Sequence, residues 1–321
     1  MKDNESALLI ENLSYTYRKD FTLVPVHALK NLSINVAQGE CFGFLGPNGA
    51  GKTTTIKCIL RLVRHTGDVF ISGVPNYQVT SRRSVGYVPE QPYFYDNLRV
   101  RELMEVYATL GGVKSHERKD AVDKALERVN LVGRDNFAVR SLSKGLMQRL
   151  AMAQAIVARP KLLILDEPFS GLDPIGRQEF RELFFALKQE GTTLFLCSHI
   201  LSDIEFLCEK AAIVAKGTLR GIVDLATRRK DSQRQVEVVL DRLGGEMFLS
   251  KLPDGAKIRR EGDSIVVICD QHESAAPFLK EVINSKIMVL EQYRPAQLNL
   301  TQLFRDLVQD EIDLAQGGHN G

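Results

Sequence analysis

The sequence predicts an α/β protein with a largely parallel β-sheet, followed by a small α+β domain. Apolar segments typical of buried strands lie at 161–165, 192–196 and 211–215, and the segment 175–190, which has helical spacing, separates the first two. Strands that alternate with helices favour a parallel sheet. After residue 235, three further strand-like segments and two helical segments indicate a second, smaller domain.

The length of 321 residues is enough for two domains. We expect the first domain over 7–225, with a helical subdomain at about 96–158 where apolar residues take helical spacing. The polar segment 226–235 is expected to be a linker, and its short basic run a solvated hinge rather than a lipid-binding patch. The small domain is expected over 236–312, and the tail 313–321 is expected to be disordered.

Within the first domain, local patterns predict further elements. Residues 7–45 have the composition of strands and turns, and 53–63 has that of a helix. The segment 67–73 predicts a short hairpin or edge strand. The glycine and prolines in 84–98 predict a segment that is mostly loop.

Composition narrows the class of protein. The 42 basic and 40 acidic residues leave a net charge of +2, which gives no strong electrostatic case for nucleic-acid binding. No apolar run reaches the roughly 20 residues of a membrane helix, and no signal peptide is evident, so any spanning segment is expected on another chain. The five cysteines are odd in number and include no CxxC pair, which favours buried free thiols in a reducing cytoplasm.

A glycine-rich motif, GPNGAGKTT, fits the pattern GxxxxGK[ST] between a predicted strand and a predicted helix. Glycines let backbone N–H groups turn toward phosphate oxygens, and the positive end of the following helix faces the same anion. We expect Lys52 to reach the β- and γ-phosphates of ATP and the Thr53 hydroxyl to bind Mg²⁺. The residues expected around the phosphates are Gly46, Pro47, Asn48, Gly49, Ala50, Gly51, Lys52, Thr53 and Thr54.

A second motif, LLILDEP at 162–168, places two carboxylates at the end of a buried strand. Ligands of parallel sheets bind at the carboxyl ends of strands. We therefore expect Asp166 to hold Mg²⁺ through water, and Glu167 to polarise the attacking water as general base.

These motifs resemble the nucleotide-binding subunit of an ABC transporter, a P-loop NTPase with a helical subdomain, over roughly residues 7–220. In that family, the LSKG segment of one subunit faces the γ-phosphate bound by the other subunit. The resemblance assigns this role to Ser143, Lys144 and Gly145. Lys144 stands where the commoner family sequence has glycine, and this SKG form resembles the exporter group called ABC-2.

The resemblance implies roles for two more residues. Asp173, in SGLD, resembles the loop that crosses between subunits. His199, at the end of the apolar run TLFLCSH, resembles the switch histidine that contacts the γ-phosphate. The other histidines are expected to be structural: His27, His65, His116, His272 and His319.

Two positions have competing candidates. The family offers a glutamine to Mg²⁺ and the attacking water, whereas GYVPEQP places Glu90 at that position and Gln91 next to it; we favour Glu90, a carboxylate that suits Mg²⁺. Tyr17 resembles the aromatic residue that stacks on adenine, and Tyr15 is close enough to compete.

The sequence therefore predicts an ATPase subunit of an ABC-2-type exporter. It is expected to form a head-to-tail homodimer that binds two ATP molecules with Mg²⁺ and powers a separate transmembrane permease from the cytoplasmic face of the cell membrane. The alternatives are a soluble ABC ATPase that acts on ribosomes or nucleic acid, and a regulatory nucleotide-binding module. Residues 236–321 resemble an accessory domain of drug-exporter ATPases, including its closing helix in QLNLTQLFRDLV. The sequence does not specify the cargo.

Overall fold

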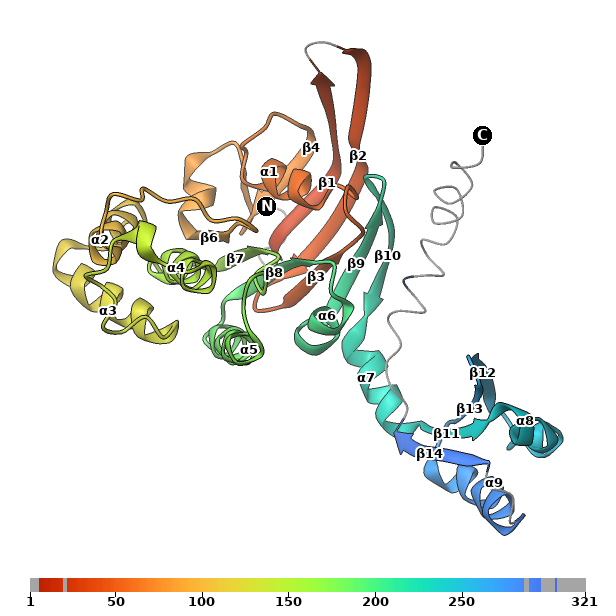
Figure 1. Ribbon diagram of the computed structural model, residues 1–321. Coiled ribbons are helices and arrows are strands. Elements are labelled where there is room, and N and C mark those ends of the chain that lie inside the picture. The colour runs from red at the N-terminus through yellow and green to blue at the C-terminus, as the bar shows by residue number, and fades with distance from the viewer. Residues whose placement is uncertain (1–5, 20–21, 286–288, 296–303, 305–321) are drawn as a thin grey trace. The chain divides into compact units, whose positions relative to one another are not determined.

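The computed structural model describes residues 6–19, 22–285, 289–295 and 304 of the chain. Contacts within the chain divide it into two units, and the division falls between Val223 and Asp224. Figure 1 labels the elements of both units.

The larger unit is built on a six-stranded sheet in the order β10-β9-β3-β8-β7-β6. The pairs β3–β8, β3–β9, β7–β8 and β6–β7 are parallel, which confirms the predicted parallel sheet. Every residue of β3, β7 and β8 is buried, because helices or the second sheet cover both faces. The strands are β3 (Cys41–Leu45), β6 (Val85–Val88), β7 (Leu162–Asp166), β8 (Thr193–Ser198), β9 (Lys210–Ala215) and β10 (Thr218–Asp224).

A second sheet, in the order β2-β1-β4-β5, has antiparallel pairs throughout. Helix α1 (Lys52–Ile59) lies in the core between the two sheets, where Ile56 shares one apolar cluster with Phe44 and Leu32. The sheet therefore backs the helix that begins at the glycine-rich motif. Its strands are β1 (Ser6–Lys19), β2 (Thr22–Ala37), β4 (Thr66–Ile71) and β5 (Val74–Pro75), and the last two form the hairpin expected near 67–73.

Helices α5 (Pro174–Gln189) and α6 (Leu201–Leu207) lie next to each other against the parallel sheet (Figure 1). Helix α5 buries an apolar stripe that includes Phe180, Leu183, Phe184 and Leu187, whose spacing follows the turn of the helix. Both helices follow strands that carry expected site residues, so their packing fixes those strand ends.

The expected helical insertion contains three helices that pack on one another (Figure 1). Arg101 ties two parts of it together through ion pairs with Asp123 (2.7 Å) and Asp135 (3.2 Å). The helices are α2 (Val100–Leu110), α3 (Arg118–Arg128) and α4 (Lys144–Ile156), with short 3₁₀ turns η2 (Ser115–Glu117) and η3 (Val139–Ser141) between them. A further 3₁₀ turn, η1 (Val79–Ser84), precedes β6 and contacts β4 and β5.

The smaller unit has the expected α+β composition. Its antiparallel sheet, in the order β12-β13-β11-β14, packs against α9 through a core that includes Val238, Val267 and Phe278. The elements are α7 (Leu225–Arg234), β11 (Val236–Asp241), α8 (Arg242–Gly245), η4 (Glu246–Lys251), β12 (Lys257–Glu261), β13 (Ser264–Cys269), α9 (His272–Asn284) and β14 (Leu290–Pro295).

Two segments contain regular structure beyond what the sequence predicted. The segment 226–235, expected to be a linker, is almost entirely helix α7. Asp224 Oδ1 accepts a hydrogen bond from the Thr227 N–H (2.8 Å), and the buried Leu225 anchors the first turn, so a polar helix forms without an apolar stripe. The segment 84–98 is mostly loop, as expected, and residues 85–88 of it form β6, an outer strand of the parallel sheet.

Some predictions fall outside the described residues, namely the closing helix in QLNLTQLFRDLV apart from Phe304, and the tail 313–321. In the described part of the chain, no helix is long and apolar enough to cross a membrane. All five cysteines are free and buried, as expected.

Candidate functional site

The glycine-rich motif forms a tight turn between β3 and α1. Gly49 (φ +81°) and Gly51 (φ +104°) take left-handed conformations that other residues rarely adopt. A Cβ on Gly46 would lie 2.4 Å from the Val214 carbonyl oxygen, so only glycine fits there. The turn therefore has the backbone needed to present N–H groups at the start of α1.

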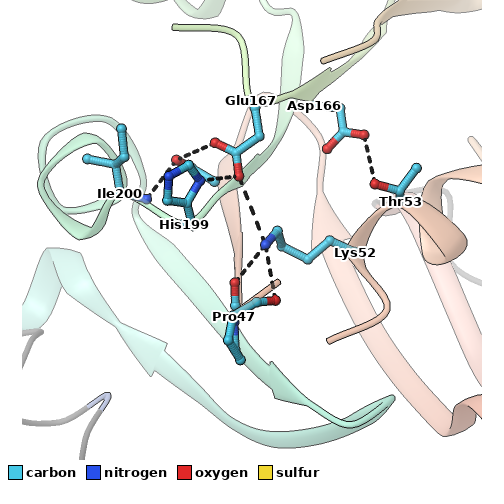
Figure 2. Close-up of polar contacts among 9 residues, drawn as sticks. Pro47, Lys52, Thr53, Asp166, Glu167, His199 and Ile200 are labelled. Carbon is cyan, nitrogen blue, oxygen red and sulfur yellow. Dashed lines mark hydrogen bonds and ion pairs between the residues drawn. The ribbon is translucent and has the colours of Figure 1, made fainter. Parts of the chain in front are cut away.

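Lys52 is buried inside this turn, with 8% of its side chain exposed. Its ammonium donates to the carbonyl oxygens of Gly46 (2.6 Å) and Pro47 (3.4 Å) and lies 3.9 Å from Glu167 Oε1 (Figure 2). The chain thus satisfies a buried cation with its own oxygens, as burial of charge requires.

Asp166 ends β7 and faces the start of α1 (Figure 2). The Thr53 hydroxyl donates to its Oδ2 at 3.1 Å. Burial raises the pKa of Asp166 to about 6; the carboxylates of Glu167 and Glu90 also raise it, whereas the Thr53 hydrogen bond and Lys52 lower it. A site that disfavours an extra negative charge in this way favours a bound cation.

Glu167 and His199 form a hydrogen-bonded pair at the ends of neighbouring strands, with His199 Nδ1 and Glu167 Oε1 2.7 Å apart (Figure 2). A carboxylate only accepts, so His199 donates from Nδ1. The Ser198 hydroxyl donates to Glu167 Oε2 (3.3 Å). Glu167 takes φ +48°, a strained conformation for a residue with a side chain and one that is found at functional sites.

These groups share a cavity of about 510 Å³. Tyr17 lines it and its hydroxyl lies 3.2 Å from Thr54 Oγ1, whereas Tyr15 packs against the core. Glu90 lines it and Gln91 does not. The full lining is Tyr17, Val26, His27, Ala28, Pro47, Asn48, Gly49, Gly51, Lys52, Thr53, Thr54, Glu90, Asp166, Glu167, His199 and Lys216.

Sequence reasoning missed two polar residues of this lining. His27, expected to be structural, comes from β2, where its Nδ1 lies 2.9 Å from Thr16 Oγ1. Lys216 comes from the turn between β9 and β10, which the Gly217 N–H ties to the Ala50 carbonyl (3.0 Å). The Lys-Gly pair at 216–217 is the one feature of the sequence that could have indicated this turn, and it belongs to no motif.

The segment Ser143–Gly145, which we call the signature half-site, lies outside that lining. Ser143 and Lys144 are exposed, and Ser143 caps α4 by accepting from the Leu146 N–H (3.3 Å). The stem of Lys144 lies across Gly171: a Cβ on Gly171, which has φ +76°, would lie 2.8 Å from Lys144 Cε. The two loops LSKG and SGLD are therefore in contact within one chain.

Asp173 also lies outside the cavity lining. Its Oδ1 accepts from the Gly176 N–H at 2.7 Å, which makes it the N-cap of α5. The structure thus gives Asp173 a role within its own chain, and its expected role between subunits stays a prediction.

The residues of the cavity fit ATP and Mg²⁺. The volume lies within the range of small-molecule sites. Among the described residues, no group of three or more His, Cys, Asp or Glu side chains could hold a metal ion by itself. Mg²⁺ in nucleotide sites is commonly held by one or two protein oxygens together with phosphates and water, and Thr53, Asp166 and Glu90 are the candidates here.

The family model described as ABC transporter matches residues 29–170. The bacitracin transport ATP-binding protein BcrA of Bacillus licheniformis is 40% identical over 217 residues, which cover 66% of this chain and 70% of BcrA. The chain belongs to the ABC transporter ATP-binding proteins. This confirms the resemblance that the motifs indicated.

Two further comparisons agree with this family. An uncharacterised ABC transporter ATP-binding protein of Synechocystis is 42% identical over 211 residues, 64% of this chain, and the match spans 60% of that relative. A solved structure titled as the dimeric structure of MJ0796, a bacterial ABC transporter cassette, is 26% identical, with a TM-score of 0.63 over 68% of this chain and 98% of that one. The ABC ATPase fold is thus shown.

Proposed function

We propose that this protein is the ATP-hydrolysing subunit of an ABC-2-type exporter. Two copies would pack head to tail and enclose two ATP molecules. Each site would combine the P-loop half-site of one copy, which we define as Lys52, Thr53, Asp166, Glu167 and His199, with the signature half-site of the other.

The observation that carries this proposal is the separation of the two half-sites. The P-loop half-site lines one cavity, whereas no residue of Ser143–Gly145 lines it. The exposed start of α4 is the positive end of a helix. Since it lies outside the cavity, it would not face a phosphate bound in the cavity of the same chain. The dimeric form of the related MJ0796 cassette supports a second copy as the source of the missing half.

The chemistry assigned to each side chain follows from its surroundings. Lys52 would exchange its carbonyl partners for phosphate oxygens. Glu167 would accept a proton from the attacking water, held in place by the His199 Nδ1–H and the Ser198 hydroxyl. Bound Mg²⁺ would neutralise charge on the phosphates. Tyr17 would stack on adenine, and Glu90 would help Thr53 and Asp166 to hold Mg²⁺.

The transport role rests on the family and on the SKG form of the signature. A relative named for bacitracin transport supports a transport role. The protein would act with a separate transmembrane permease on the cytoplasmic face of the membrane.

Mixing two inactive variants tests the shared site. Lys52→Ala disables the P-loop half-site. Gly145→Asp places a negative charge where the triphosphate would bind; a Cβ there has ordinary contacts, and an acidic residue suits the first turn of α4. In a mixed dimer, one site takes both defects and the other takes none. We expect each variant alone to be inactive and the mixture to regain up to about a quarter of wild-type turnover per chain.

Failure of the mixture to regain activity, with each variant folded and inactive, would contradict the head-to-tail dimer. The transport role has a separate test. We expect tagged Glu167→Gln, solubilised gently from membranes with Mg-ATP, to retain a polytopic membrane protein. Ribosomal or nucleic-acid partners in its place would overturn the transporter assignment and leave only the ATPase.

A further inference from the structure

Helices α5 and α6 are joined by a buried ion pair. Arg181 Nη2 on α5 lies 2.7 Å from Asp203 Oδ1 on α6. The Asp203 side chain is fully buried and that of Arg181 is 25% exposed. Neither residue belongs to a motif of the sequence or lines the cavity of the P-loop half-site.

The same guanidinium also contacts two aromatic rings. Its Cζ lies 5.0 Å from the ring centre of Phe206, on α6, and 6.0 Å from that of Phe169. Phe169 is buried and lies two residues after Glu167. Arg181 therefore contacts both the segment that follows Glu167 and the helix that follows His199.

Chain connectivity makes these contacts relevant to the site. Only Ile200 separates His199 from the first residue of α6, and the Ile200 N–H is bonded to the Ser198 hydroxyl (3.0 Å). The Glu167 N–H is bonded to the Cys197 carbonyl (3.0 Å). A shift of α6 relative to Phe169 would thus change the separation of Glu167 and His199, which are 2.7 Å apart.

Stability alone does not account for the pair. Buried ion pairs are weak stabilisers compared with apolar side chains of similar volume. This pair uses a single hydrogen bond, and within the described part of the chain Arg181 Nε and Asp203 Oδ2 have no hydrogen-bond partner. The pair instead fixes how α6 is oriented relative to α5, because a planar guanidinium stacked on aromatic rings holds a fixed orientation.

We propose that Arg181 is a positioning residue that sets the geometry of the Glu167–His199 pair. It holds α6 through Asp203 and Phe206 and the Glu167 segment through Phe169. This inference rests on the proposed function, since it needs ATP hydrolysis that depends on Glu167.

The test measures kcat, KM for ATP and nucleotide affinity. Arg181→Met would leave Asp203 buried and unpaired, so the main variant combines Arg181→Met with Asp203→Asn. We expect its kcat to fall about 10- to 100-fold, because a misplacement of about 1 Å can cost that much, while ATP affinity changes less than twofold. Arg181→Lys keeps the charge and loses the planar stack, so it should recover only part of the loss.

A matched control lies on another face of α5. Glu179 pairs with Arg149 of α4 at 2.5 Å, and Glu179→Gln removes that ion pair without touching Phe169 or α6. We expect its kcat to stay within twofold of wild type. A double-mutant cycle gives the decisive readout: when His199 is already alanine, the Arg181→Met/Asp203→Asn change should lower kcat no further.

If the folded Arg181→Met/Asp203→Asn protein had the kcat of wild type, the role of Arg181 would be overturned. The role would also be overturned if this double substitution lowered kcat equally with His199 present and with His199 replaced by alanine. Both results leave the proposed function intact provided that Glu167→Gln is inactive. A wild-type protein without ATPase activity, or with activity that Glu167→Gln retains, overturns both proposals.

Discussion

The P-loop half-site and the signature half-site use similar side chains in opposite surroundings. Lys52 is 8% exposed and bonded to two carbonyl oxygens of its own loop, whereas Lys144 is exposed and only its stem contacts Gly171. Thr53 donates to a buried carboxylate. Ser143, also exposed, caps its own helix.

The difference shows which half-site a single chain can assemble without a partner. Buried charges must be satisfied within the chain, so the P-loop half-site is assembled before any partner arrives. Exposed polar groups need no partner within the chain, because water satisfies them. The signature half-site can therefore exist without a bound ligand until another molecule provides one. Substitutions in one half-site at a time would either widen this difference or remove it.

The largest effect is expected for Glu167→Gln. Loss of the general base should lower kcat about 10²- to 10⁴-fold, while ATP affinity is retained because Lys52 and Tyr17 are untouched. Steady-state turnover and nucleotide binding check this, with the surface substitution Glu190→Gln as control. Equal turnover of Glu167→Gln and wild type would remove Glu167 from the mechanism.

Two lysine substitutions compare the halves directly. Lys52→Ala should weaken ATP binding by a single chain about 10- to 100-fold, the value of a charge-assisted contact to phosphate. Lys144→Ala should leave single-chain affinity unchanged and weaken only ATP-dependent dimerisation. Nucleotide titration of dilute protein and size-exclusion chromatography of concentrated protein separate the two results. If Lys144→Ala lowered the ATP affinity of a single chain, the two half-sites would not differ in the way described above.

A third effect concerns the stability of the nucleotide-free, metal-free protein. The pKa of Asp166 is raised from 3.8 to about 6 by burial, so its ionised form is disfavoured in the folded state. The contribution of Asp166 to stability therefore falls as pH rises from about 4 to 6, by about 3 kcal/mol at most. Asp166→Asn should melt at a higher temperature than wild type at pH 7.5, and the gap should shrink toward pH 4. A gap independent of pH would exclude this cause.

Much of the P-loop half-site could be predicted because its residues lie at fixed places in a regular fold. Lys52 and Thr53 begin a helix after a strand, and Asp166 ends a buried strand, so the motifs fix their backbone positions. His27 and Lys216 could not be predicted, because their place in the cavity depends on how β2 and the β9–β10 turn pack beside the motif.

Other features that the sequence did not reveal have a similar origin. The lack of apolar residues in 226–235 gave no indication of helix α7, which Asp224 caps and Leu225 anchors. Arg181 carries no signal in the sequence, because its partner Asp203 lies on the next helix and neither belongs to a motif. Such contacts depend on tertiary packing, which the spacing of residues does not encode.

The cap that Asp173 provides for α5 has a consequence for association between copies. If this carboxylate moved to contact a partner, α5 would lose its Gly176 hydrogen bond. Loss of an N-cap costs about 1 kcal/mol, or about 2 kcal/mol for two subunits. That amounts to roughly a 30-fold lower association constant. A dimer that recruits Asp173 would therefore need a correspondingly higher protein concentration to form, unless bound nucleotide supplies the difference.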